Sequence, residues 1–435
     1  MSSEANAENG LLTRLIVAER NEIPAVVAGF LLFFLLFASY FMLRPVRETF
    51  GIAGGIDNLQ WLFTGTFLAT LVVVPLYGYV ALRRPRRTLL PILYTICATV
   101  MACFATSLLI DPDNLWVARA FYIWLSVMNL FVISIAWSLM ADLFTPGQAH
   151  RLFGQIAAGA SLGGLVGPVL SAVLAGTVSE AGLLYISTAL LLSTLLCARY
   201  LMGWRDRTGA PADPSSSNRQ RIGGTAWGGI TLILRSPYLM GIALFVIFIA
   251  TANTFLYFEQ ARIVSETFTD RAEQTRVFAS IDALVQSLTI LVQIFFTGRL
   301  AKRLGVSVLL AAVPVIMMFG FGLLSLAATF PVLAFVMIVR RVGEYALVRP
   351  GREMLFTAVD QETKYKAKNV IDTFVYRGGD AVAGWAYTGI VAIASTAAVA
   401  IAGAIIAGLW ALLGLAIGRK HDRMAKEENT RPPTV

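Results

Sequence analysis

Charged residues are scarce in this sequence. They make up only 14% of the 435 residues, whereas a soluble globular chain carries about 25%. Hydrophobic residues make up 57% and gather in runs of about 20 residues, the length of a helix that crosses the hydrocarbon core of a bilayer. This shortage of charge excludes a soluble protein. It predicts an all-α polytopic membrane protein, with the lipid bilayer as a partner.

Cysteine and histidine are nearly absent. The three cysteines, Cys97, Cys103 and Cys197, fall inside apolar runs and have neither metal-ligand nor disulfide spacing. Both histidines, His150 and His421, lie in polar stretches outside these runs. Their positions exclude metal catalysis and a histidine proton relay. No nucleophile or cofactor constellation is visible either, so we expect no enzyme, no cofactor and no metal.

The N-terminus lacks the short apolar core and the small-residue cleavage site of a removable signal peptide. Instead, Leu11, Leu12, Leu15 and Ile16 recur at helical spacing, which predicts an amphipathic cytoplasmic segment at 1–22 lying on the membrane surface. The net charge of +9 is compatible with nucleic-acid binding. Basic loops on one side of a membrane explain the same charge, so we expect no nucleic-acid partner.

Periodicity and length predict twelve transmembrane helices. They lie at residues 23–43, 60–82, 89–110, 115–140, 153–176, 181–201, 238–258, 277–297, 306–330, 332–349, 370–394 and 396–418. An even number places both termini on one side. Basic residues cluster after even-numbered spans, as at 83–87, while the opposite loops hold Asp111, Asp113 and Glu180. The positive-inside rule therefore places both termini in the cytoplasm.

A polar linker at 203–237 divides the chain into two six-helix halves, 23–202 and 238–418, followed by a cytoplasmic tail at 419–435. The linker core at 209–217 is rich in Gly, Pro and Ser, a composition typical of a flexible tether.

The two halves repeat short charged stretches. Residues 43–50, at the end of the first span, are echoed at 262–268, with an arginine, a valine and a Glu-Thr-Phe triplet in register. Residues 78–83 are echoed at 298–303, with Gly, Ala and Arg at the same spacing. A parallel repeat of this kind predicts a substrate site between the halves, near the bilayer midplane.

Ionisable side chains lie inside several spans, where each costs about 2.5–3.5 kcal/mol to insert. Arg340 and Glu344 are four residues apart and share a helical face. They form either a self-neutralising pair or part of a cavity. Arg341 and Arg349 leave a surplus of positive charge on this span, which favours a cavity that receives an anion.

One span carries a continuous polar stripe. Asp282, Gln286, Thr289, Gln293 and Thr297 recur at helical spacing on an otherwise apolar helix. A lipid-facing helix does not carry such a stripe. The stripe either lines a cavity that holds water or substrate, or it makes polar contacts with a neighbouring helix.

The two echoed stretches place charges at the outer ends of the first and seventh spans. Tyr40, Arg44 and Arg47 share a face, with Glu48 beside them. In the second half Glu259, Arg262 and Glu266 share a face. These residues form a charged entrance used by a substrate, pair across the two halves, or extend into the headgroups.

Two further patterns mark the fifth and eleventh spans. Arg377 and Asp380, at i and i+3 near the start of the eleventh, are spaced to pair. The fifth span contains the glycines Gly154, Gly159, Gly163, Gly164 and Gly167, the last followed by Pro168. Their spacing favours close helix packing and also resembles the start of an antiporter motif.

The twelve spans, the linker and a Gly-x-x-x-x-Arg turn after the second span of each half resemble the major facilitator superfamily. The acidic residue of that loop motif is replaced by Leu82 in one copy and Lys302 in the other.

A narrower resemblance is to the bacterial branch of the ATP/ADP translocase family. The stretch 40–48 is similar to its Leu-Arg-x-x-Lys-Asp run, and 151–159, 364–369 and 372–380 are similar to further blocks. The resemblance implies nucleotide exchange across a bacterial inner membrane. Arg47 replaces the family's lysine, and no span contains lysine.

We therefore predict a monomeric secondary transporter that works by alternating access and exchanges anionic solutes, such as ATP and ADP. The expected substrate-binding residues are Tyr40, Arg44, Arg47, Arg262, Gln286, Gln293, Arg340 and Arg377. The expected coupling or gating residues are Glu48, Glu259, Glu266, Asp282, Glu344 and Asp380. The alternatives are a proton-coupled carrier of another organic anion or drug, and a non-transporting receptor or scaffold.

Overall fold

The fold was analysed in a computed structural model, which describes residues 18–208 and 226–430. The amphipathic helix expected around Leu11 to Ile16 and the flexible linker core expected at 209–217 lie outside the described residues. Within the described part the helices are joined by short loops, and the only β-type pairing is one isolated bridge between Ala175 and Val178.

The first half is built from six long helices. They are α2 (Ile23–Ala53), α3 (Leu59–Arg83), α4 (Arg86–Ile110), α5 (Leu115–Leu143), α6 (Pro146–Leu174) and α7 (Glu180–Thr208), with a short 3₁₀ turn η1 (Ile56–Asn58) before α3. Local signals set several starts. Asn114 caps α5, and Thr145 with Gln148 forms a capping box at α6.

The second half contains more and shorter pieces. They are α9 (Ala226–Arg235), α10 (Pro237–Thr267), α11 (Arg271–Val292), η2 (Gln293–Thr297), α12 (Gly298–Leu326), α13 (Phe330–Gly343), η3 (Glu344–Val348), α14 (Arg349–Leu355), η4 (Phe356–Ala358), α15 (Gln361–Val370), η5 (Ile371–Val375), α16 (Tyr376–Ile393) and α17 (Thr396–Thr430). Three of them, η2, η3 and η5, are single π-helical segments.

The twelve predicted spans all correspond to helical segments. Ten of the described helices are long and apolar enough to cross a membrane. The tenth and eleventh spans are composite: α13, η3 and α14 form one, and α15, η5 and α16 form the other. Their π segments and charged residues interrupt the apolar runs.

Two predicted boundaries are wrong in a way that matters for the site. α2 continues to Ala53 instead of ending at residue 43, and α10 continues to Thr267 instead of 258. The charged stretches at their ends are therefore helical. Pro45 is accommodated inside α2, and Val46 and Phe50 around it are fully buried by neighbouring helices. The charged side chains of α2 are thus largely buried among helices, whereas Glu266 at the end of α10 is exposed.

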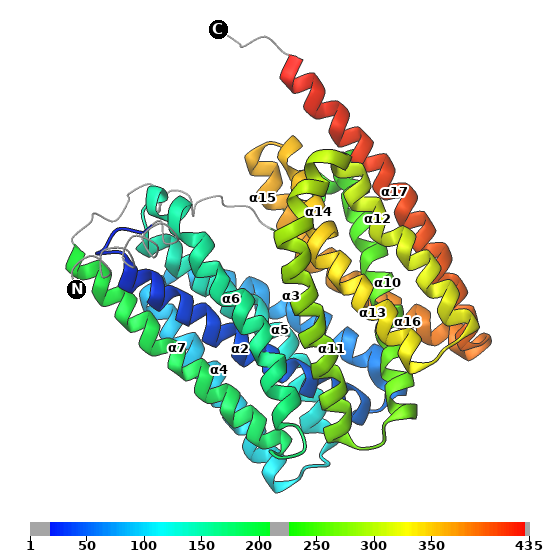
Figure 1. The fold of residues 1–435 in the computed structure, drawn as a ribbon, viewed down its shortest axis with the longest axis horizontal. Helices are drawn as coiled ribbons and strands as arrows, with labels where there is room; N and C mark the ends of the chain where they lie inside the picture. Colours follow the sequence, from blue (N-terminus) through cyan, green and yellow to red (C-terminus); the bar gives the residue numbers. More distant parts are fainter. Residues whose placement is uncertain (1–17, 209–225, 431–435) are drawn as a thin grey trace, which may run out of the picture.

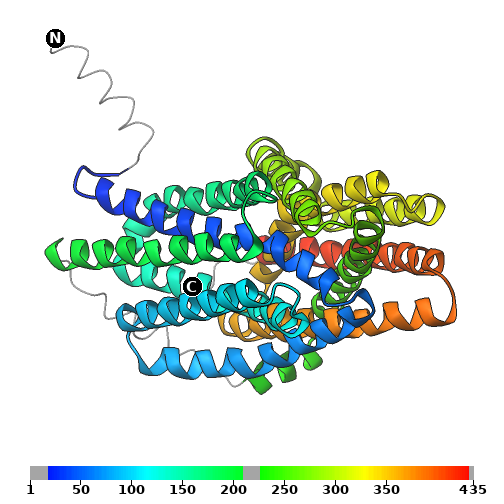
Figure 2. The same cartoon turned by 90° about the horizontal axis from the view of Figure 1, so that it is seen from below.

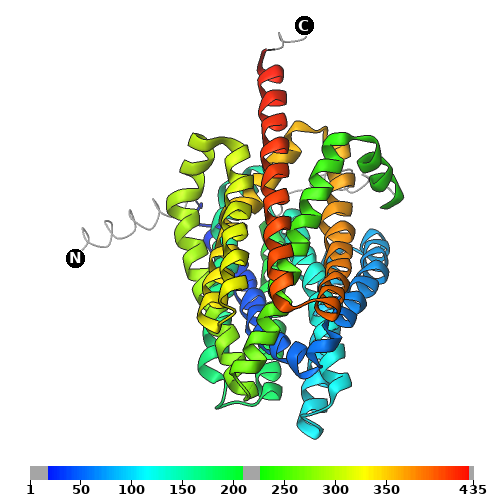
Figure 3. The ribbon, with the colours of Figure 1, turned by 90° about the vertical axis from the view of Figure 1, so that its right-hand side faces the viewer.

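The two halves lie side by side, with α4 and α7 on one side of the molecule and α12, α16 and α17 on the other (Figure 1). Each half has its own hydrophobic cluster, although Leu59, Leu62 and Tyr122 of the first half join the cluster of the second. α2 runs obliquely so that it also contacts α10 and α11 (Figure 2). α17 projects beyond the other helices at the end where it leaves the bundle (Figure 3).

The linker is helical where it leaves and re-enters the bundle. α7 continues to Thr208, and α9 forms before the seventh span begins. α9 packs closely on α15, because a Cβ added at Gly229 would lie 2.6 Å from the backbone oxygen of Lys366. We call the end of the bundle where α2 begins and α17 leaves the linker end.

The glycines predicted to allow close packing do so in part. A Cβ added at Gly159 or Gly163 of α6 would lie 2.2 Å from a backbone oxygen of α2, and one at Gly167 would lie 2.7 Å away. Gly154 meets nothing within 4 Å, and Gly164 faces the side chain of Gln286. Gly159, Gly163 and Gly167 therefore bring α6 against α2 over about two turns, which holds α2 in place beside the cavity.

Replacing Gly163 with alanine should destabilise the protein. An added methyl cannot be accommodated against a backbone oxygen without moving α2, and overpacking costs about 1–3 kcal/mol. The matched control is Gly154→Ala, which has open space and should gain up to about 1 kcal/mol of helix propensity. Thermal unfolding in detergent checks both. Equal melting temperatures for the two variants would contradict the packing role.

Candidate substrate-binding site

A cavity of about 800 Å³ lies between the two halves. α2, α3, α5 and α6 line it from the first half, and α10, α11, the composite tenth span and η5 with α16 line it from the second. Toward the linker end the cavity reaches Arg352 and Glu353, and Glu353 has a half-exposed side chain. The cavity therefore opens toward the linker end.

The opposite end is closed by contacts between the halves. Thr49 and Thr275 are hydrogen-bonded at 2.8 Å, and the Tyr122 hydroxyl donates to the Tyr257 hydroxyl at 2.9 Å. Arg276 donates to the backbone oxygen of Ala175 at 2.6 Å. Further contacts join Arg271 to Asp113 and Trp61 to Trp385. This end is a closed gate of hydrogen bonds and aromatic contacts.

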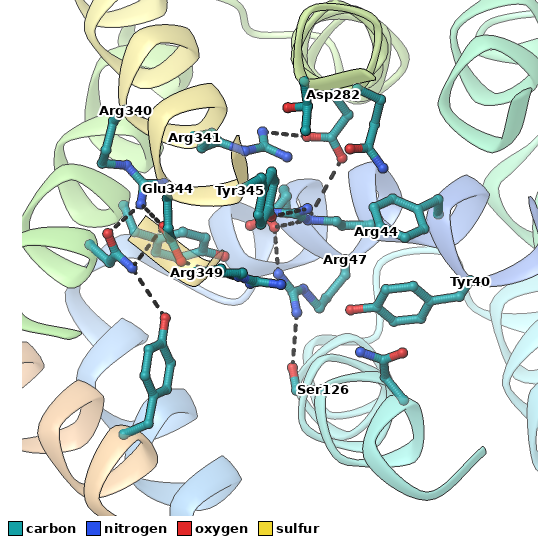
Figure 4. A pocket seen from close by; sticks show the side chains of 18 of the residues that line it. Tyr40, Arg44, Arg47, Ser126, Asp282, Arg340, Arg341, Glu344, Tyr345 and Arg349 are labelled. Atoms are coloured by element: carbon teal, nitrogen blue, oxygen red, sulfur yellow. Dashed lines mark hydrogen bonds and ion pairs between the residues drawn. The ribbon is translucent and has the colours of Figure 1, made fainter. Parts of the chain in front are cut away.

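Asp282 of α11 lines the cavity and pairs with arginines from both halves (Figure 4). Its Oδ1 lies 2.5 Å from Nη1 of Arg341, and its Oδ2 lies 3.7 Å from Nε of Arg44. Arg341 is only 4% exposed, and its Nε and Nη2 have no hydrogen-bond partner. Arg341 thus keeps two buried donors that Asp282 does not use.

Arg47 lies one turn further along α2. Its Nη2 contacts Oε1 of Glu48 at 2.5 Å, its Nη1 donates to Ser126 at 3.2 Å, and its guanidinium lies over the Tyr122 ring at 5.2 Å. Glu48 also lies 3.9 Å from Nε of Arg44. The outer end of α2 thus places two arginines on one carboxylate, inside the bundle.

A second charged cluster lies on the composite tenth span. Arg340 donates to Glu344 at 2.8 Å and also to the side-chain oxygen of Asn253. Asn253 in turn donates to Glu344 at 3.3 Å and to the Tyr376 hydroxyl at 3.1 Å. Arg349 lies 3.8 Å from Glu344, but its side chain is 57% exposed. Glu344 therefore balances Arg340 and leaves Arg349 facing the open cavity.

Arg377 and Asp380 pair as predicted, at 3.5 Å. Arg377 also donates to the backbone oxygen of Ser126 at 3.4 Å, and Thr254 donates to Asp380 at 3.3 Å. This pair connects α16 with α5 of the other half and with α10.

The polar stripe of α11 divides into two parts. The first part of the stripe lines the cavity and consists of Asp282, Gln286 and Thr289. Gln293, which also lines it, donates to the backbone oxygen of Tyr345 at 3.3 Å, and Thr297 donates to that of Ala346 at 2.9 Å. These carbonyls belong to the π segment η3. One part of the stripe thus faces the cavity, and the other holds two helices together.

The second copy of the charged echo lies elsewhere. Arg262 binds Glu259 at 2.7 Å and Glu266 at 3.0 Å, and Tyr387 donates to Glu259 at 2.8 Å. None of Arg262, Glu259 and Glu266 lines the cavity. They pair with one another at the outer end of α10, so the geometry gives no support to the binding and gating roles expected for them.

Residues outside the predicted binding and gating sets also line the cavity, among them Arg341 and Arg349, which the sequence marked only as surplus positive charge. Arg341, Tyr345 and Arg349 lie beside the predicted Arg340 and Glu344. Arg349 lies over the Tyr345 ring at 4.5 Å, and Arg44 donates to the Tyr345 hydroxyl at 3.5 Å. A π segment adds a residue to the turn and rotates the helix face that follows. The prediction assumed regular helical spacing, which does not allow for that rotation.

The centre of the cavity is therefore positive. The arginines Arg44, Arg47, Arg340, Arg341 and Arg349 face the carboxylates Glu48, Asp282 and Glu344, with each of these carboxylates shared by two arginines. Among the described residues, no lysine and no histidine lines this cavity. Tyr40, Tyr122 and Phe41 add aromatic surface beside the charges.

Two helical halves around a central polar cavity, open at one end and closed at the other, have the architecture of a membrane transporter. The model of the Major Facilitator Superfamily matches residues 25–359, and the chain belongs to this superfamily. A search of curated proteins finds no match.

Solved structures of transporters share the fold. A bacterial homologue of the human lysosomal transporter Spinster, in an inward-facing and unoccupied conformation, aligns at 12% identity over 96% of this chain and 100% of its own, with a TM-score of 0.60. A mutant of the nucleoside transporter NupG aligns at 14% identity over 90% and 99%, with a TM-score of 0.68. The human organic anion transporter MFSD10 aligns at 15% over 91% and 100%, with a TM-score of 0.59.

Replacing Asp282 with asparagine should destabilise the protein. Two guanidinium groups lose their shared carboxylate, and uncompensated buried charges of this kind cost about 3–5 kcal/mol. Glu266→Gln is the matched control, because Glu266 is an exposed partner of Arg262 and such pairs contribute about 0–1 kcal/mol. Thermal unfolding in detergent measures both. Equal effects in the two variants would contradict the central place of Asp282.

Proposed function

We propose that this protein is a secondary transporter that works by alternating access and exchanges anionic solutes, with ATP, ADP or related nucleotides as the leading candidates. The observation that carries the proposal is the surplus of buried arginine around Asp282, between the two halves. A buried positive charge is costly unless something balances it. A bound anion supplies that balance.

Phosphate-bearing solutes suit the donors on offer. A guanidinium presents a planar fork of N–H groups that matches phosphate oxygens, and in the described part of the chain every cationic residue lining the cavity is arginine. The free Nε and Nη2 of Arg341 form one such fork. Cavities of about 300–1,000 Å³ are typical for drug-sized ligands, and this one falls in that range.

The nucleotide assignment has separate support. The end of α2 resembles the charged run of nucleotide antiporters, and Arg44 and Arg47 of that run line the cavity. Tyr40, Phe41 and Tyr122 provide surfaces on which a base can stack beside the arginines. The fold likeness to NupG is too distant in sequence to indicate a substrate.

The positive-inside rule supports an orientation in a bacterial inner membrane. Basic residues gather near the linker end, which we assign to the cytoplasm together with both termini. The conformation described here then faces inward. We propose a monomer as the working unit, with the cavity between its own two halves.

A second candidate, a proton-coupled carrier of another organic anion, is favoured by one observation. Asp380 lines the cavity, is 7% exposed and pairs with a single arginine, Arg377. A buried carboxylate in such a place is suited to carrying a proton.

Proteoliposomes distinguish the two candidates. Vesicles loaded with ADP should take up labelled ATP faster than empty vesicles, because exchange needs an internal partner. Proton coupling predicts instead that uptake follows a pH gradient and stops with an uncoupler. Equal uptake into loaded and empty vesicles would contradict obligate exchange.

Arg47→Lys should change the rate and the substrate preference of transport. Lysine loses the contacts to Ser126 and to the Tyr122 ring that hold the guanidinium in the cavity. We expect a decrease of about tenfold for at least one substrate, equivalent to one lost charge-assisted hydrogen bond.

Arg262→Lys is the control for this variant, because Arg262 is the echoed arginine and lies outside the cavity lining. Its transport should stay close to that of the wild type. If both variants transport like the wild type, Arg47 has no binding role.

A further inference from the structure

The charges in the centre of the cavity do not balance. Five arginines, Arg44, Arg47, Arg340, Arg341 and Arg349, face three carboxylates, Glu48, Asp282 and Glu344. The remaining cavity arginines, Arg377 and Arg352, pair with Asp380 and Asp372, and Glu353 pairs with Lys368 outside the lining. The centre is therefore left with two more positive than negative groups.

The open conformation tolerates this imbalance because one of these charges is solvated. Arg349 is 57% exposed, whereas Arg44, Arg47, Arg340 and Arg341 are largely buried. Closing the linker end removes Arg349 from water. The closed and empty protein then contains two uncompensated guanidinium groups in a medium of low dielectric constant, which is strongly unfavourable.

The unused donors point to where the missing charge belongs. Arg341 has two buried nitrogens without a partner, and the Nε atoms of Arg340 and Arg47 are also unpartnered. These donors come from α2 and α13, which belong to different halves. An anion bound among them contacts both halves at once.

We propose that the cargo must bring about two negative charges before the cavity can close, so that the empty protein stays open and exchange is obligatory. This inference rests on the proposed anion transport and specifies its cargo as a dianion. A phosphate monoester carries about −1.5 to −2 at neutral pH and meets the requirement. A singly charged carboxylate does not. Within the nucleotides this favours a monophosphate, or a polyphosphate whose extra charge a bound cation offsets.

The test changes the charge of the cavity without any cargo. Gln286 lines the cavity one turn from Asp282, against Gly164 of the other half. Gln286→Glu adds a carboxylate of the same shape and reduces the surplus by one. Arg349→Gln removes one positive charge, which also reduces the surplus by one. Each variant should close more readily than the wild type when no anion is present.

Controls of equal size keep the charge unchanged. Gln286→Met removes the polar amide without adding charge, and Arg349→Lys keeps the positive charge. If the charge balance governs closure, neither control changes the open population. With two independent pairs of variants, the test stands even if one substitution prevents folding for unrelated reasons.

Closure is measured as a distance between the halves at the linker end. Spin labels at His150 of α6 and Tyr365 of α15, both exposed, report it by double electron–electron resonance in nanodiscs, after replacement of Cys97, Cys103 and Cys197. We expect Gln286→Glu and Arg349→Gln to raise the ratio of closed to open protein at least about tenfold in an anion-poor buffer. Unchanged distances in both, or equal shifts in their controls, overturn the inference.

The proposed function is tested separately in the same samples. Addition of ADP, AMP or inorganic phosphate should close the wild-type protein. If none of them does, phosphate-bearing anions are not the cargo and the proposed function fails. The effect of Gln286→Glu without any anion is independent of that result.

Discussion

One carboxylate, Asp282, holds an arginine from each half of the molecule. Arg341 belongs to the second half and Arg44 to the first, and both are withdrawn from bulk water. Burying three charged groups together is tolerable only when their partners are close and correctly placed. The continuation of α2 beyond residue 43, its tight contact with α6, and the position of α13 all serve that placement.

The two halves repeat in sequence but differ in what they contribute. The charged end of α2 points into the cavity, whereas the matching end of α10 forms a closed ion cluster with Tyr387. In the described part of the chain, the three π segments all belong to the second half. Two of them meet where Gln293 and Thr297 bind carbonyls of η3. The repeat thus supplies the scaffold, and the site itself is asymmetric.

Much of the fold and part of the site could be predicted from the sequence. Hydropathy locates the spans because the cost of exposing backbone to lipid leaves few alternatives to helices. Arg340, Glu344 and Asp282 stand out because an ionisable group inside a span needs a partner or a function. Tyr345 could not be assigned from regular helical spacing, since it lies within η3, which rotates the face. Arg341 lies before η3, and its place in the site depends on the packing of α13 against Asp282 of α11. The position of Arg262 outside the cavity lining depends on tertiary packing, which no local sequence pattern predicts.

A cryo-electron microscopy map of the protein in nanodiscs with a phosphate-bearing nucleotide tests the central claim most directly. The account predicts phosphoryl density between Arg44 and Arg341, within hydrogen-bond distance of the free Nε and Nη2 of Arg341, with the Asp282 carboxylate displaced from at least one of its arginines. A bound nucleotide whose phosphates lie away from these two arginines, with Asp282 still between them, would contradict it.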